Sequence, residues 1–265
     1  MYTAKEIANI FETIAPIASG IPGDELGFIF GDPSTVIRGI ACMWNVHSRS
    51  IALAAGQGLN MLICHEALWM TSQNSPWYSG PGAAQIRPNN LRREMLERHG
   101  MVVYRSHSNW DALPLDGVPD QAVSALGISG LKVIGGQRFF KVHELPEPMT
   151  VYALKTHAEK GLGYGGCRIF GNGEKQVRRF AFLVGGFGEN QYNMPQVALE
   201  MGAEALVIGD MSEFIVIAAL EMGLPVIETL HSVSESPAIK RQAEILAERL
   251  PNLRVVYIPS GALAF

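Results

Sequence analysis

The chain of 265 residues has little cysteine and no long apolar run. Its three cysteines, Cys42, Cys64 and Cys167, are too few and too scattered for a disulfide framework or a cysteine-rich zinc site. No apolar stretch approaches the roughly 20 residues that a membrane span needs. The first fifteen residues carry Lys5 and Glu6 within a helical period, which is not the pattern of a secretory signal. We therefore expect a cytoplasmic protein that does not interact with membranes.

Charge is also sparse. Only 17% of the residues are charged, the formal net charge is -4, and no long basic run is present. This composition argues against non-specific nucleic-acid binding as the main activity, because that binding depends on clustered positive charge. The hydrophobic fraction of 48% is typical of a globular protein with a large core. The length suggests one or two lobes.

One short stretch combines a buried strand with residues that can carry chemistry. Residues 61–63 form an apolar run that follows Gly58, and the run stops at Cys64, His65 and Glu66. This pattern predicts a strand of an α/β sheet, and ligands of open α/β sheets gather at the carboxyl ends of strands. Imidazole and carboxylate groups suit Zn²⁺, Mn²⁺ or Fe²⁺. Taken alone, His65 could equally be a hydrogen-bonded histidine at a strand end, and Cys64 is expected to be a buried thiol.

The order of helix, glycine and apolar strand occurs twice. Residues 58–65 match residues 202–210, and each segment is followed by another helix. Residues 100–104 then match residues 223–227, each a glycine that leads into a strand. The similarity is coarse, and its value is geometric. It predicts two similar α/β lobes with mixed sheets that face a shared metal cleft.

Both later strands lead into a histidine with an acid four residues on. These pairs are His107 with Asp111 and His231 with Glu235. Residues four apart on a helical turn share a face, so each pair could hold a metal ion or could form an ordinary surface hydrogen bond. Two such pairs at matching positions, together with His65, favour the metal site. Carboxylates shared between two ions are typical of hydrolytic two-metal sites.

The remaining expectations concern the lobes and other segments. The predicted first lobe is 1–125, the second is 126–251, and the final strand within 252–265 returns to the first lobe. Strands are expected over 131–142 and 149–154, and a last helix over 237–250. The turn at 185–188 could cradle an anion or could simply join a strand to a loop. The loop at 69–88, which is rich in Gly, Pro and Ser, suggests a lid or a subunit contact. Four other histidines are expected at the surface or at helix ends: His47, His99, His143 and His157.

Taken together, these motifs resemble the NIF-three-like family of dinuclear-metal proteins, often labelled type-two GTP cyclohydrolase homologues. The likeness covers most of the chain and lies in segments 26–32 (LGFIFGD), 64–69 (CHEALW), 106–111 (SHSNWD), 185–188 (GGFG), 208–210 (IGD) and 230–235 (LHSVSE).

The resemblance implies two bound divalent metal ions. It implies ligands at His65, Asp111, His231 and Glu235, and a further ligand at the position of Glu66. The family usually has a second histidine there, and an oxygen ligand would favour Mn²⁺ or Fe²⁺ over Zn²⁺. The sequence also departs from the family pattern at Ala67, where a proline is usual, and around Phe214, where a histidine is usual. The resemblance further implies a ring-shaped homohexamer with metal sites facing an internal cavity.

The leading hypothesis is a cytoplasmic metal-dependent hydrolase that activates water for attack on a small molecule. Asp111 and Glu235 would share the ions, and His107 is the candidate for proton transfer. The family label suggests a nucleotide as substrate, although the chain has no clear nucleotide motif. The alternative is a non-catalytic metal-binding scaffold or regulatory interaction protein, which the altered position at Glu66 motivates.

Overall fold

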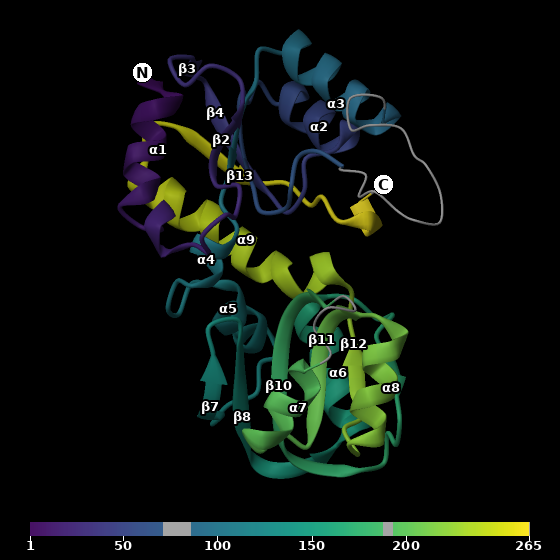
Figure 1. The fold of residues 1–265 in the computed structure, drawn as a ribbon. Helices are drawn as coiled ribbons and strands as arrows, with labels where there is room; N and C mark the ends of the chain where they lie inside the picture. The colour runs from purple at the N-terminus through teal and green to yellow at the C-terminus, as the bar shows by residue number, and fades with distance from the viewer. Residues whose placement is uncertain (71–85, 188–192, 265) are drawn as a thin grey trace. The chain divides into compact units, whose positions relative to one another are not determined.

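The computed structural model describes residues 1–265 except 71–85, 188–192 and 265 (Figure 1). The fold is mixed α/β, which confirms the predicted class. By its internal contacts the chain forms two compact units, the first comprising 1–110 with 239–265 and the second comprising 111–238. The boundaries between the units, after residues 110 and 238, lie earlier in the chain than those of the expected lobes, 1–125 and 126–251. Most of the predicted loop at 69–88 lies outside the described residues.

The first unit is built on a sheet in the order β13-β4-β5-β6-β2, where β2 is antiparallel to β6 and the other pairs are parallel. The final strand therefore pairs with β4, near the opposite end of the sequence. The elements of this unit are β1 (Tyr2–Thr3), α1 (Ala4–Glu12), β2 (Gly27–Phe30), β3 (Val36–Ile37), β4 (Gly39–Met43), α2 (Ser48–Gly56), β5 (Met61–Cys64), α3 (Arg87–Arg98), β6 (Val102–Arg105), most of α4 (Ser108–Asp111), the later part of α9 (His231–Arg249) and β13 (Arg254–Tyr257).

Helices cover both faces of this sheet. Ile51 of α2 and Leu96 of α3 belong to one core cluster with Leu62 of the sheet. Phe11 of α1 packs edge-on against Tyr104 of β6, with ring centroids 5.7 Å apart. Buried on both faces, β4, β5 and β6 appear in the sequence as continuous apolar runs rather than as alternating patterns.

The second unit is built on a mixed sheet in the order β7-β8-β10-β11-β12-β9. Only the pairs β10–β11 and β11–β12 are parallel. Its elements are α5 (Val118–Ala125), β7 (Lys132–Gln137), β8 (Phe140–Thr150), α6 (Val151–Leu162), β9 (Arg168–Phe170), β10 (Gln176–Phe187), α7 (Met194–Glu200), β11 (Ala205–Met211), α8 (Glu213–Glu221), β12 (Val226–Glu228) and the first turns of α9.

Three predicted elements differ from the structure. The strand expected over 131–142 is a hairpin, formed by β7 and the first residues of β8. The strand expected over 149–154 is wrong, because α6 begins at Val151, where the Thr150 side chain caps it by accepting a hydrogen bond from the Ala153 amide at 3.1 Å. The last helix begins at His231 rather than at Pro237, so the proline lies inside α9. A proline more often marks a first turn, since inside a helix it removes one backbone hydrogen bond.

The three cysteines are free and buried, as expected for Cys64. Burial raises the pKa of the Cys64 thiol to about 12. Among the described residues, no helix combines the length and the apolar character that a membrane span requires.

Candidate metal centre

Two of the predicted site histidines meet at the carboxyl ends of neighbouring strands in the first sheet. His65 directly follows β5, and His107 comes two residues after β6 ends. Because β5 and β6 are adjacent parallel strands, their carboxyl ends lie side by side. The two imidazole rings accordingly lie in edge-on contact, with centroids 4.8 Å apart.

The orientation of His65 is set by a backbone carbonyl. Its Nδ1 lies 3.1 Å from the carbonyl oxygen of Ser106, and the residue is 1% exposed. A carbonyl only accepts, so Nδ1 carries the proton and the Nε2 lone pair can face a cation. Histidines that ligate metals commonly have their second ring nitrogen held in this way.

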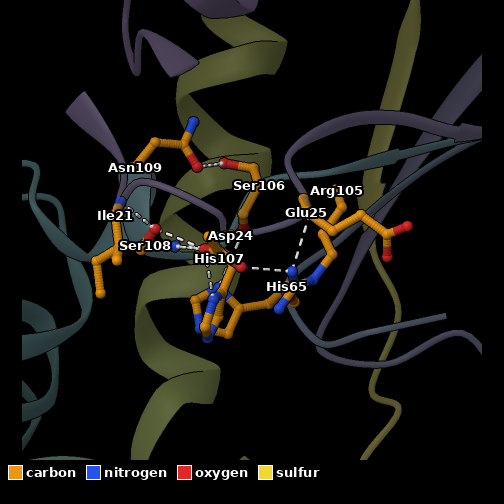
Figure 2. A network of polar contacts seen from close by, with 9 residues as sticks. All are labelled: Ile21, Asp24, Glu25, His65, Arg105, Ser106, His107, Ser108 and Asn109. Atoms are coloured by element: carbon orange, nitrogen blue, oxygen red, sulfur yellow. Dashed lines mark hydrogen bonds and ion pairs between the residues drawn. The ribbon is translucent and has the colours of Figure 1, made fainter. Parts of the chain in front are cut away.

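His107 is oriented by a carboxylate that lies far away in the sequence. Its Nδ1 lies 2.8 Å from Asp24 Oδ2, and the Ser108 hydroxyl also donates to that oxygen (Figure 2). Burial raises the pKa of Asp24, but the hydrogen bonds from Ser108 and His107 and the charge of Arg105 lower it more, so the pKa is held well below its usual range. Asp24 is therefore an anion that keeps a proton on His107 Nδ1, which leaves Nε2 available.

Arg105 joins the two histidine supports. Its guanidinium Nε donates to the carbonyl oxygen of His65 at 3.0 Å, and one terminal nitrogen lies 2.7 Å from Asp24 Oδ1 (Figure 2). The side chain is almost fully buried. Removing either Arg105 or Asp24 would leave the charge of the other buried and uncompensated.

Asp24 was not identified as a site residue from the sequence. It lies in the loop before β2, and its partner His107 is 83 positions away. The only local signal is an acidic residue before a predicted strand, which many surface loops share.

The second unit groups three further polar side chains. His231 begins α9, and its Nδ1 lies 3.1 Å from Asp210 Oδ1, while its Nε2 lies 3.3 Å from Glu235 Oε1. A neutral imidazole has only one N–H, so it cannot donate to both carboxylates. A metal ion held at one of these nitrogens would remove the conflict. The pairing of His231 with Glu235 is the i,i+4 arrangement that the sequence predicts.

Glycines of β10 make the space for this group. A Cβ added at Gly185 would lie 2.6 Å from Glu235 Oε1 and 2.9 Å from His231 Nε2. A Cβ at Gly186 would lie 2.5 Å from Asp210 Oδ1. The turn predicted at 185–188 is wrong for residues 185–187, which belong to β10, and its first two glycines contribute by lacking side chains; Gly188 lies outside the described residues.

The remaining predicted ligands are Glu66 and Asp111. Glu66 is half-buried, and a ligand atom of His65 lies within 4.8 Å of one on Glu66 and of one on His107. Asp111 is buried, ends α4 and is the first residue of the second unit. The structure thus groups His65, Glu66 and His107 in the first unit, and Asp210, His231 and Glu235 in the second.

Of the four other histidines, expected at the surface or at helix ends, His47 confirms its prediction and His143 does not. His47 is 5% exposed and caps α2 by accepting a hydrogen bond from the Ser50 amide, which is its expected place at a helix end. His143 lies in the middle of β8 and is 4% exposed. It is buried because β8 lies between β7 and β10. A single histidine in a sequence does not reveal that its strand is an inner one.

The donor chemistry fits divalent transition-metal ions. Imidazole nitrogens whose opposite nitrogens are held by a carbonyl or a carboxylate suit Zn²⁺, Mn²⁺ and Fe²⁺, and carboxylate oxygens extend the choice toward Mn²⁺. The glycines at 185 and 186 leave space beside His231 and Glu235 that a side chain would otherwise fill. Both observations are consistent with metal binding.

Comparison with known proteins gives matches along nearly the whole chain. A "GTP cyclohydrolase 1 type 2 homolog" of Clostridium perfringens is 25% identical over 255 residues, covering 93% of this chain and 92% of the relative. A protein of the same name from Yersinia pestis is 30% identical over 187 residues, covering 70% of this chain and 73% of the relative.

Solved structures share the fold. A Bacillus cereus protein related to NIF3 matches with a TM-score of 0.80 at 17% identity, covering 98% of this chain and 96% of that one. The protein ybgI, of unknown function, matches with a TM-score of 0.81 at 22% identity, covering 98% and 99%. The family model described as Duf34/NIF3 (NGG1p interacting factor 3) matches residues 2–261. The chain therefore belongs to the Duf34/NIF3 family.

Proposed function

We propose that this protein is a metal-dependent hydrolase with a dinuclear centre. The observation that carries the proposal is the pair His65 and His107, whose rings touch and whose Nδ1 atoms are both held by the protein. The names of the curated relatives support a nucleotide-related small molecule as substrate. The proposed ligands are His65, Glu66, Asp111, His231 and Glu235.

Divalent ions at such a centre supply Lewis acidity that activates water for attack. The chain itself supplies the handling of protons. His107 is about one-third exposed, and Asp24 holds its Nδ1, so Nε2 can accept a proton from water or return one to a leaving group. The buried Arg105 keeps Asp24 anionic, so the carboxylate continues to hold His107 Nδ1 while Nε2 exchanges the proton.

The acids divide into two roles. Glu235 is almost fully buried beside His231, so its charge calls for a cation close by. Asp210 is about half exposed and faces the other nitrogen of the same ring, where it orients His231 rather than binding an ion. Asp111 is assigned as a ligand because it aligns with the family motif and is buried.

A homo-oligomer is also proposed, in line with the family resemblance. Helix α8 supports it, since Phe214, Ile217 and Leu220 are 61%, 47% and 37% exposed. Apolar residues this close together on one helix are typical of a surface that another chain covers. Light scattering of the wild type and of Phe214→Glu would test this, with a smaller assembly expected for the variant. The free, buried cysteines support the cytoplasm as the proposed location.

The central test measures metal content and turnover in the same samples. Protein purified without added metal is expected to contain about two equivalents of divalent ion by mass spectrometry, with the element identified by anomalous scattering. His65→Ala and Glu235→Ala should lose metal and turnover on a panel of phosphoester, amide and cyclic-nucleotide substrates. His99→Ala, which alters an exposed histidine at the end of α3, is the matched control.

The outcomes separate the hydrolase from its alternative. Tight metal binding that these variants abolish, without turnover of any substrate, would favour the metal-binding scaffold. Full metal content in both alanine variants would reject the proposed centre.

A further inference from the structure

A groove in the second unit lies apart from the histidines and acids assigned to the metal centre. It has a volume of about 550 Å³ and runs between α5, the turn at 127–131, the edge strand β7 and its neighbour β8. Residues on its walls include Leu115, Ser124, Val133 and His143. Small-molecule sites are commonly concave and mostly apolar, with a few polar groups that fix orientation.

His143 places an imidazole in the wall of this groove, among both apolar and polar side chains. Val133 of β7, His143 of β8 and Phe180 of β10 are direct neighbours across three adjacent strands. The imidazole stacks on the fully buried Phe180 ring, with centroids 5.5 Å apart and planes inclined by 25°. On its other side is Val133, which is 59% exposed. His143 therefore lies where the core opens into the groove.

The Nδ1 atom of the buried His143 ring makes no hydrogen bond within the described part of the chain. The residue is 4% exposed. Burial, followed by the nearby charge of Lys141, lowers its pKa to about 4, although the charge of Asp120 and the backbone of Lys141 raise it by less, so the ring is neutral near pH 7. A buried polar atom without a hydrogen bond is costly, and in a native protein it often marks a site for a ligand or a water molecule.

The rim of the groove carries a strained residue. Leu115 has a φ of 69°, a backbone conformation that residues other than glycine rarely adopt. The residue is 77% exposed. The strain is maintained by α5, because the Leu115 amide donates to Asp120 Oδ2 and its carbonyl accepts from Gln121 Nε2, both at 2.8 Å. An apolar side chain held outward at such a cost is typical of a functional contact.

The charged groups around the groove are already paired. Asp120 binds the Lys141 ammonium through Oδ1 and the Leu115 amide through Oδ2. An additional charge on the ligand would therefore have no free counter-charge in Asp120 or Lys141. The exposed apolar side chains of Leu115 and Val133 instead suit an uncharged apolar body.

We propose that this groove binds an uncharged small molecule with an apolar ring and a hydroxyl or N–H group. The ring lies between Leu115 and Val133, and the polar group hydrogen-bonds the imidazole of His143. A hydroxyl both donates and accepts, so it can satisfy either neutral tautomer of the ring. The site does not depend on the proposed metal centre.

Phenol and toluene form a matched pair of probes, since they differ by one hydroxyl. Phenol is expected to bind with a dissociation constant on the order of 1 mM, and to shift the ring nitrogen signals of His143 in two-bond ¹H–¹⁵N spectra. Toluene should bind about fivefold more weakly, the ratio that one net hydrogen bond produces. His143→Phe should reduce the phenol affinity by a similar factor while leaving toluene unaffected, and His99→Phe is the control.

A second variant tests binding in the groove if His143→Phe does not fold. Ser124→Phe adds a ring on the exposed side of α5 at the groove wall, and should abolish binding of both probes without lowering Tm; Ser124→Ala should bind both normally. Equal affinity for phenol and toluene, or phenol binding that neither His143→Phe nor Ser124→Phe weakens, would overturn the proposal.

Discussion

At the scale of single residues, the space beside His231 and Glu235 depends on missing side chains. Gly185 has a φ of 71°, and any Cβ there would collide with both site residues. Gly58 has a similar φ of 74°, but a Cβ there would meet nothing within 4 Å. Alanine at either position would adopt a strained backbone conformation, but only at Gly185 would its Cβ also collide with other side chains.

Gly185→Ala is expected to weaken divalent-metal binding by about tenfold or more, because it displaces the side chains of two proposed ligands. Gly58→Ala should keep wild-type metal affinity and lose only about 1–2 kcal/mol of stability from its backbone conformation. Competition with a chromophoric chelator measures the affinities, and denaturant unfolding measures the stabilities. Equal metal affinities in the two variants would show that the glycine is not required for the site.

A second residue-scale prediction concerns acid. The pKa of His143 falls from 6.5 to about 4 on folding, so the unfolded chain binds the proton at higher pH than the folded protein does. Folding stability should therefore fall as the pH drops from about 6.5 to about 4, by roughly 3 kcal/mol from this residue. His143→Phe should remove that part of the pH dependence, and His99→Phe should not. Urea unfolding at pH 7, 5.5 and 4.5 provides the measurement.

At the scale of elements, α6 approaches the end of α5 through a glycine. A Cβ at Gly161 would lie 1.9 Å from the carbonyl oxygen of Ala125. Replacing a helical glycine with alanine usually stabilises a helix by about 1 kcal/mol, since the unfolded chain loses freedom. Here the contact between the two helices should reverse that sign.

Gly161→Ala is accordingly expected to destabilise the protein by about 2 kcal/mol, a typical cost of overpacking. Gly56→Ala, at the end of α2 with no atom within 4 Å of the added carbon, should be neutral or stabilising. Thermal unfolding of both variants checks the pair. A stabilised Gly161→Ala variant would mean that α5 and α6 can separate without cost.

Other elements show what the sequence could predict. The helical period around Lys5 and Glu6 and the apolar run of β5 are local signals, and both predictions are confirmed, since α1 begins at a capping box of Thr3 with Glu6. Helix α6 was missed because it opens with Val151 and Tyr152, which favour strands, and contains Gly161, whose reason is a tertiary contact. Asp24 could not be recognised, because its role arises from a partner distant in sequence.

At the scale of the whole molecule, the proposed ligands are divided between the two units. Metal binding should therefore protect both units together if they share one centre. Adding Mn²⁺ at about 100 times its dissociation constant is expected to stabilise the folded protein by about 2.7 kcal/mol. Hydrogen exchange should slow at the ends of β5 and β6 in one unit and at the start of α9 in the other.

The matched control is His99→Ala, which should respond to Mn²⁺ as the wild type does. Glu235→Ala should lose the protection in both units. Protection confined to one unit would contradict a shared centre, while leaving a separate site within that unit.

Strand β13 gives the first unit a further property. It is hydrogen-bonded along β4 from Arg254 to Tyr257, although the whole second unit is synthesised between β4 and β13. While residues 111–238 are being synthesised, the outer side of β4 has no strand to pair with, and unpaired strand edges invite aggregation. A nascent chain of this protein thus carries an open edge at β4 throughout synthesis of the second unit, and only the emergence of β13 closes it.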